Sequence, residues 1–248
     1  MIPKKIHYCW FGGNPLPKKD RKCIESWKKY CPDYEIIEWN ESNYDLNKNR
    51  YMADAYKERK WGFVPDYARF DIIYNHGGFY LDTDVELIKS LDILRENHAY
   101  MGFEGEIWVN GGIGFGAEEG HSVIKGLRDI YDSLSFYQND GTLNLKPSPY
   151  YITDYLESIG LVRDNSEQII NGLHIYPTDY FAAKDYDTGK IYKTSNTISI
   201  HQYNASWKTP KQKFVYRLKS TIGQKKFNRL LALKKFLHFA DCKIKLDN

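Results

Sequence analysis

Apolar and polar positions along the first forty residues predict two strands with a helix between them. Residues 5–11 (KIHYCWF) and 34–39 (YEIIEW) are short β-prone runs, and the first ends at a glycine pair. Between them, apolar residues recur at helical spacing over residues 17–30, and Pro17 suits the first helical position. This order predicts a strand–helix–strand unit with a right-handed crossover.

The same two periods predict elements along the chain to residue 201. The expected helices cover residues 51–60, 65–75, 91–96, 122–134 and 150–158. The expected strands cover residues 79–82, 100–103, 108–115, 168–176 and 191–201, and a polar loop or flap covers 137–148. Gly111, Gly112 and Gly114 interrupt one of these strands, which indicates a bulge or a close approach by another group.

Two carboxylates stand at the end of the strand expected near residue 80. Asp82 and Asp84 are two positions apart, so in an extended chain they project to the same side. With no Lys or Arg between them they repel each other, and a hard divalent cation, which also holds nucleotide phosphates, removes that repulsion. Asp66 and Arg69 lie on one face of the preceding helix. These residues predict a metal-bound, activated sugar where strand end and helix meet.

Composition narrows the class of protein without identifying it. At 248 residues the chain can form one or two domains with a full core. A net charge of +3 does not call for a nucleic-acid partner, and none is expected. The four cysteines form no C-x-x-C pair and are expected to be reduced thiols. The aromatic content of 16% is high, and such side chains either fill the core or stack on the ring of a base or sugar.

Several blocks of the sequence resemble a known enzyme family. They are IPKKIHYCWFGG at 2–13, VPDYARFDIIYNHGGFYLDTDV at 64–85, NGGIGF at 110–115 and HQYNASWK at 201–208. Together they resemble glycosyltransferase family 32, the family with a D-x-D sugar-binding region that is related to the glucosyltransferase domains of large glucosylating bacterial toxins. The resemblance covers residues 1–208 and implies an α/β fold of the GT-A type. In that fold a mostly parallel, doubly wound sheet is flanked by helices, and the donor binds at the strand ends.

The resemblance also implies roles for individual residues of the donor site. Trp10 matches a tryptophan that stacks on uracil, although a core role is the alternative. Asp66 and Arg69 match the catalytic pair that holds ribose and sugar hydroxyls, and the alternative for them is a surface salt bridge. Tyr80 is expected near the ribose or sugar. Asp82 is expected to contact hydroxyls, and the metal through water, while Asp84 is expected to bind the metal directly.

Residues later in the chain complete the implied site. His201 is the expected further metal ligand, a departure from the toxin-like enzymes, which carry a carboxylate there. Imidazole with carboxylates suits Mn²⁺, with Mg²⁺ as the alternative. Ser206 and Trp207 are expected at the β-phosphate, with Lys208 or another cation nearby. Asn110 is expected to contact the sugar or acceptor. Glu104 and Glu106 are further acceptor candidates, and the favoured alternative for each is a solvated loop residue.

The implied activity is metal-dependent transfer of a hexose with retention of the anomeric configuration. The expected donor is a UDP-linked sugar, and the expected acceptor is a saccharide or a lipid-linked acceptor. The usual role of small enzymes that resemble this chain suggests that it acts in bacterial surface polysaccharide synthesis. Two alternatives remain: a metal-dependent phosphohydrolase or nucleotidyltransferase, and a non-catalytic carbohydrate-binding module. The first of these lacks support, because the sequence contains neither G-x-x-x-x-G-K-[ST] nor a second acidic cluster.

The end of the chain differs in character from the rest. Residues 209–248 are expected to be a separate basic tail with an amphipathic helix over 214–239. That helix either packs on the domain with a solvated basic face or attracts anionic lipid at a membrane surface. Because no signal peptide or spanning segment is evident, the expected location is the cytoplasm, with peripheral contact on the inner face of the membrane as the alternative.

Overall fold

An eight-stranded mixed sheet forms the centre of the computed structural model, which describes residues 1–186 and 188–204. Its strand order is β2-β1-β3-β7-β5-β9-β8, and β6 pairs with β5 at the side of this path. The strands are β1 (Lys5–Cys9), β2 (Glu35–Trp39), β3 (Gly78–Tyr80), β5 (Ala99–Glu104), β6 (Trp108–Val109), β7 (Phe115–Ala117), β8 (Gln168–Ile170) and β9 (Leu173–Tyr176).

Parallel pairing organises the N-terminal half of the sheet. Strand β1 is parallel to both β2 and β3, and β5 is parallel to β9, whereas β7 runs antiparallel between β3 and β5. The strand–helix–strand unit expected over the first forty residues is therefore confirmed, with β1 and β2 in register from Lys5↔Glu35 to Cys9↔Trp39. The α/β class with flanking helices is confirmed too, although the sheet combines parallel and antiparallel pairs.

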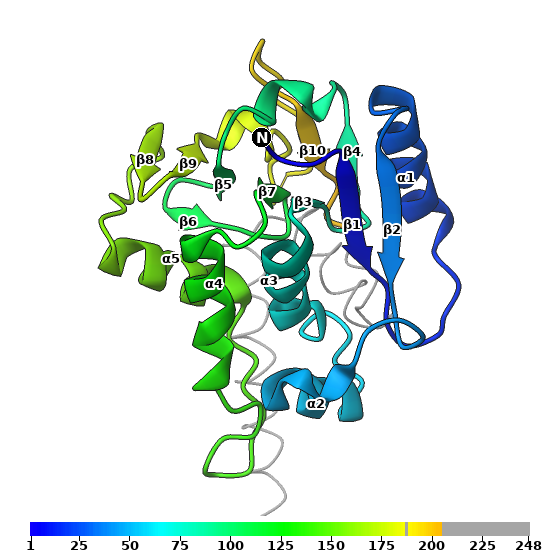
Figure 1. Cartoon of the computed structure of the whole chain (residues 1–248), viewed down its shortest axis with the longest axis vertical. Coiled ribbons are helices and arrows are strands. Elements are labelled where there is room, and N and C mark those ends of the chain that lie inside the picture. Colours follow the sequence, from blue (N-terminus) through cyan, green and yellow to red (C-terminus); the bar gives the residue numbers. More distant parts are fainter. Residues whose placement is uncertain (187, 205–248) are drawn as a thin grey trace, which may run out of the picture. The chain divides into compact units, whose positions relative to one another are not determined.

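Helices cover the sheet at the places that the periodicity predicts (Figure 1). They are α1 (Lys18–Tyr30), α2 (Arg50–Lys57), α3 (Pro65–His76), α4 (Ser122–Asp129) and α5 (Ser148–Ser158), with 3₁₀ turns η1 (Leu46–Lys48), η2 (Leu91–Leu94), η3 (Ile130–Asp132) and η4 (Thr178–Tyr180). Helix α5 begins earlier than expected because Pro149 fits its first turn. Within the described residues, no helix has the length and apolarity needed to cross a membrane.

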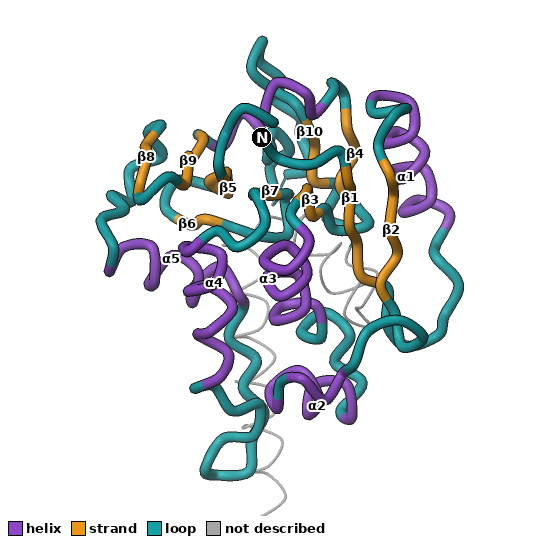
Figure 2. Tube along the Cα trace, viewed as in Figure 1, coloured by secondary structure: helices purple, strands orange, loops and turns teal. Residues whose placement is uncertain are grey.

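Three expected strands are divided or shortened, as Figure 2 shows. Residues 168–176 form a β8–β9 hairpin, because Asn171 and Gly172 have φ of 48° and 81° and make a tight turn. The glycine-rich run 108–115 separates β6 from β7. Of residues 191–201, only β10 (Ser199–His201) is a strand. It pairs antiparallel with β4 (Val85–Leu87), which the sequence pattern did not predict.

Two apolar clusters occupy the two faces of the sheet. Neighbouring residues of a strand point to opposite faces, so Phe79 joins the cluster that contains Trp27 of α1, and Tyr80 joins the cluster that contains Phe70 of α3. Cys9, Cys23 and Cys31 are buried and free in the structure. The expected tail, residues 209–248, lies outside the described residues.

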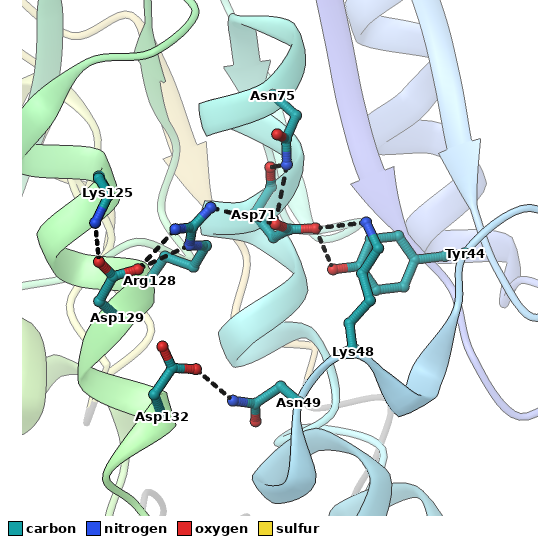
Figure 3. Close-up of polar contacts among 9 residues, drawn as sticks. All are labelled: Tyr44, Lys48, Asn49, Asp71, Asn75, Lys125, Arg128, Asp129 and Asp132. Atoms are coloured by element: carbon teal, nitrogen blue, oxygen red, sulfur yellow. Dashed lines mark hydrogen bonds and ion pairs between the residues drawn. The ribbon is translucent and has the colours of Figure 1, made fainter.

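Helix α3 is buried on nearly every side and is tied to its neighbours by Asp71 (Figure 3). One carboxylate oxygen of Asp71 accepts hydrogen bonds from Tyr44 Oη at 2.8 Å and Lys48 Nζ at 3.0 Å. The other accepts one from Asn75 Nδ2 at 2.9 Å and lies 3.6 Å from Arg128 Nη1 of α4. Buried charges need such partners to offset desolvation. We call Asp71 and these partners the Asp71 hub. It fixes the position of the helix whose first turns carry Asp66 and Arg69.

Candidate functional site

The β4–β10 pair brings His201 to the D-x-D segment. His201 is in register with Val85, the residue that follows Asp84, and its Nε2 lies 3.2 Å from Asp84 Oδ1. The chain then turns over the carboxylate: the backbone N–H of Asn204 donates to Asp84 Oδ2 at 2.8 Å, and that of Gln202 donates to the Asp84 carbonyl at 2.8 Å. The structure thus brings together the two residues predicted as direct metal ligands.

The second ring nitrogen of His201 faces another carboxylate. Nδ1 lies 3.2 Å from Glu104 Oε1 at the end of β5, and Glu104 Oε2 accepts from Asn110 Nδ2 at 2.8 Å. Burial lowers the pKa of His201, but the charges of Asp84 and Glu104 outweigh it and raise the pKa to about 10. In the absence of metal, His201 is therefore a cation between two anions at neutral pH.

The positive charge of His201 lowers the pKa values of Asp84 and Glu104. Burial raises the pKa of each carboxyl group, and the attraction of His201 together with hydrogen bonds outweighs burial, so both pKa values lie below their usual range. Both carboxylates are consequently ionised and able to attract a divalent cation.

The first turns of α3 place Asp66 and Arg69 beside Asp82. Arg69 Nη2 lies 3.1 Å from Asp66 Oδ1 and 3.7 Å from Asp82 Oδ1. The Asp66 and Arg69 side chains are only 5% exposed, so the surface salt bridge of the alternative reading is excluded. Burial raises the pKa of Asp66 to about 7, against the opposing effect of Arg69. Burial also raises the pKa of Asp82.

A cavity of about 310 Å³ lies next to Arg69, Asp82, Asp84 and His201. Its lining also includes three aromatic residues, Trp10, Phe11 and Trp61, which are called the aromatic wall below. The cavity is lined by Cys9, Trp10, Phe11, Asn14, Pro15, Pro17, Trp61, Gly62, Pro65, Arg69, Asp82, Thr83, Asp84 and His201. Such a combination of flat apolar surface and a few converging polar groups is typical of a ligand site.

Trp61 is a site residue that sequence reasoning missed. Its ring packs on the backbone at Gly12, where a Cβ atom would lie 3.0 Å from the indole, so the Gly12 turn and Trp61 together shape the wall next to Trp10. The signal lay in the Trp-Gly pair at 61–62, an aromatic residue in the short gap before Pro65 starts α3.

Tyr80 and Asn110 lie behind the cavity rather than among the residues that line it. Tyr80 is 1% exposed, and the Arg69 guanidinium lies 5.3 Å from the centre of its ring. The Asn110 side chain is used within the protein, because it donates to Glu104 and accepts from the Gly112 N–H at 2.7 Å. Direct sugar contacts of both residues remain predictions. Ser206, Trp207 and Lys208 lie outside the described residues.

The arrangement of Asp84 and His201 fits a divalent cation. Two ligands at about 2.1 Å on adjacent corners of an octahedral ion are about 3 Å apart, close to the 3.2 Å between Asp84 Oδ1 and His201 Nε2. No group of three His, Cys, Asp or Glu residues gathers as a metal site in the part of the chain that the structure describes. The expected contribution of Asp82 is accordingly one through water, and phosphate oxygens and water would complete the shell.

Comparison with known proteins points to one kind of chemistry. Residues 17–100 match the family model described as "Glycosyltransferase sugar-binding region containing DXD motif". Subversion of eukaryotic traffic protein A of Legionella pneumophila is 23% identical over 218 residues, which cover 67% of this chain and 33% of that protein. Inositol phosphoceramide mannosyltransferase 3 of Schizosaccharomyces pombe is 30% identical over 112 residues, 40% of this chain and 29% of that protein. The chain thus spans about a third of these two relatives.

A third relative matches over most of both lengths. The uncharacterized glycosyltransferase L373 of Acanthamoeba polyphaga mimivirus is 25% identical over 228 residues, 84% of each chain. Among solved structures, the PaToxG glycosyltransferase aligns over 63% of this chain and 69% of its own with 18% identity and a TM-score of 0.48. The galactosyltransferase LgtC, solved with donor and acceptor sugar analogs, aligns over 91% and 94% with 13% identity and a TM-score of 0.42.

Proposed function

We propose that this chain is a glycosyltransferase with a DXD sugar-binding region and that it moves a hexose from a nucleotide sugar to an acceptor hydroxyl with the help of a divalent cation. The observation that carries the proposal is the meeting of Asp84 and His201 beside a cavity that Trp10, Phe11 and Trp61 also line. A cation held there would bind the diphosphate, and the wall would take the base.

Each part of the cavity matches one part of such a donor. Base–aromatic stacking is worth roughly 1–3 kcal/mol, and Trp10 and Trp61 offer the ring surface for it. Arg69 and Asp82 line the same cavity and would bind ribose or sugar hydroxyls. Uracil is the base proposed, on the match of Trp10 to the uracil-stacking tryptophan of the resembling enzymes.

The cation, Mn²⁺ or Mg²⁺, would act as a Lewis acid on the departing diphosphate. The chain's own residues would hold the donor in place. Asp84 and His201 would hold the cation at the diphosphate end, and Arg69, 3.7 Å from Asp82, would keep that carboxylate directed at the sugar. These contacts accelerate transfer only as far as they tighten while the sugar–phosphate bond breaks.

Retention of the anomeric configuration is the proposed stereochemical course. Asp82 and Asp84 are the carboxylates among the described residues that line the cavity, and both are assigned to donor and cation. A separate base to activate the acceptor is therefore not evident there. Attack from the face that the diphosphate leaves, with a phosphate oxygen taking the proton, requires no such base.

The proposed acceptor is a saccharide or a lipid-linked saccharide. One relative supports the choice by its name, because it is a mannosyltransferase of inositol phosphoceramide, a lipid. Mannose, the sugar in this name, is a hexose. A role in surface polysaccharide synthesis at the cytoplasmic side of a membrane stays a prediction.

A panel of UDP- and GDP-hexoses, incubated with and without Mn²⁺, tests the proposed function. We expect metal-dependent release of the nucleoside diphosphate from one donor, its loss in excess chelator, and its recovery on adding Mn²⁺. Asp84→Asn should lower this turnover at least about 100-fold, because a neutral amide is a poor ligand for a hard cation. Asp140→Asn, in an exposed loop, is the matched control. Turnover that persists in chelator would contradict the metal role.

A further inference from the structure

Glu104 stands behind His201 in a place that the proposed chemistry leaves unassigned. Its side chain is 23% exposed, and its Oε1 lies 3.2 Å from His201 Nδ1, on the ring edge away from Asp84. Among the described residues, Glu104 does not line the cavity. It therefore contacts the ring of His201 and not the cavity, and the acceptor contact that its sequence position suggested stays a prediction.

The protein fixes Glu104 before any ligand arrives. Its second oxygen accepts from Asn110 Nδ2 at 2.8 Å, and Asn110 in turn accepts from the Gly112 N–H at 2.7 Å. The backbone N–H of Asn110 donates to the Gly102 carbonyl at 3.2 Å, and Glu104 pairs with Trp108 in the β5–β6 ladder. The carboxylate is thus held by strand pairing and by an amide.

The two nitrogens of His201 require different partners if the ring is to bind a cation. A neutral imidazole carries one N–H and one lone pair, and only the lone pair can bind a metal. When the ring gives up its Nε2 proton, Nδ1–H still donates to Glu104, and the lone pair lies on Nε2, the atom next to Asp84. A carboxylate behind a metal-binding histidine has this effect generally: it fixes ring orientation and tautomer and raises the basicity of the ligand.

We propose that Glu104 is a positioning residue that holds the Nδ1–H of His201, so that Nε2 is presented to the cation shared with Asp84. The inference rests on the proposed metal-dependent function. It assigns Glu104 no contact with donor or acceptor, and it links the glycine-rich loop at 110–112 to the metal site through Asn110.

The test is a calorimetric titration of Mn²⁺ into the full chain without a donor. Glu104→Gln preserves side-chain shape, but its amide cannot accept from both His201 and Asn110, so one of the two hydrogen bonds is lost. We expect Mn²⁺ affinity to fall about 10- to 100-fold, as for other residues behind a metal-binding histidine. The control Glu106→Gln makes the same chemical change at an exposed position two residues away and should bind like wild type.

A spectroscopic readout separates positioning from a general loss of structure. Electron spin echo modulation of bound Mn²⁺ should show a directly bound nitrogen in the wild type and in Glu106→Gln. That nitrogen signal should be weakened in Glu104→Gln and missing in His201→Ala. If Glu104→Gln does not fold, Asn110→Ala frees the same carboxylate from its amide and should weaken Mn²⁺ binding by a smaller factor.

The outcomes distinguish this inference from the function on which it rests. A wild type that binds no Mn²⁺ and transfers sugar in chelator overturns the proposed metal dependence. A wild type that binds Mn²⁺ through nitrogen, with Glu104→Gln equal to it in affinity and nitrogen signal, overturns the role of Glu104 alone. Reduced affinity in Glu104→Gln with a normal Glu106→Gln supports the role.

Discussion

A single methyl group at Gly112 tests how closely Asp82 must be placed. A Cβ atom added at Gly112 would lie 2.5 Å from Asp82 Oδ2, and its next contact is Asn110 Oδ1 at 3.3 Å. The backbone of Gly112 is outside the left-handed region, so alanine can adopt its conformation. In Gly112→Ala the methyl group would therefore clash mainly with the Asp82 carboxylate, which can rotate away from it.

The size of the effect follows from that distance. Ordinary van der Waals contact begins at 3.4 Å, so the carboxylate must retreat by about 0.9 Å. A misplacement of about 1 Å in a catalytic site can cost about 10²-fold in rate. We expect kcat/KM for the nucleotide sugar to fall by about that factor. The melting temperature should change little, because Gly→Ala restricts the unfolded chain and recovers about 0.4–1 kcal/mol.

Gly111→Ala is the matched control for this experiment. A Cβ atom there meets Phe70, Arg69 and Ile152 at 3.3–3.6 Å, and no contact with Asp82 is among its three nearest. Steady-state kinetics and thermal melts of both variants decide the matter. If Gly112→Ala kept kcat/KM within a factor of about three of wild type while folded, the reasoning that Asp82 needs this position would be refuted.

Two further predictions concern the α3 pair. Arg69→Lys leaves a point charge that cannot face both Asp66 and Asp82, so the nucleotide-sugar KM should rise and kcat fall, together about 10- to 100-fold; a wild-type KM would contradict the assignment. Burial holds the pKa of Asp66 at about 7, above its usual 3.8, so ionising this carboxyl costs stability progressively as pH rises from 3.8 through 7. Asp66→Asn should raise the melting temperature at pH 8 more than at pH 4, and equal shifts would show that Asp66 is not the group responsible.

Local pattern predicted much of the frame that positions the site. Helix α3 begins at Pro65 and reaches its C-cap at Gly77, as the proline and glycine signals indicate. Asp82 and Asp84 both lie at the cavity, and Arg69 joins them from α3. These residues are close in sequence, so helix and strand periodicity alone could relate them.

Contacts between distant segments could not be derived in this way. The β4–β10 pairing depends on two runs of three residues that are far apart in the chain, too short for an alternation to show. The contact of Glu104 with His201 follows from that pairing, so Glu104 looked like a solvated loop residue. The Asn171-Gly172 pair is a local signal for a turn. The expected single strand over 168–176 instead joined the apolar residues on both sides of this pair.

The Asp71 hub has a consequence for the orientation of α3 about its own axis. A helix buried from Asp66 through Ile73 has no single apolar stripe, so apolar packing alone would allow several rotations of the helix about its axis. Successive residues are about 100° apart around the axis, and a slip of one position would turn the Arg69 guanidinium away from Asp82. The carboxylate of Asp71 can contact Tyr44, Lys48 and Arg128 in only one rotation of the helix. These contacts therefore also fix the direction in which the side chains of the first turns, Asp66 and Arg69, point.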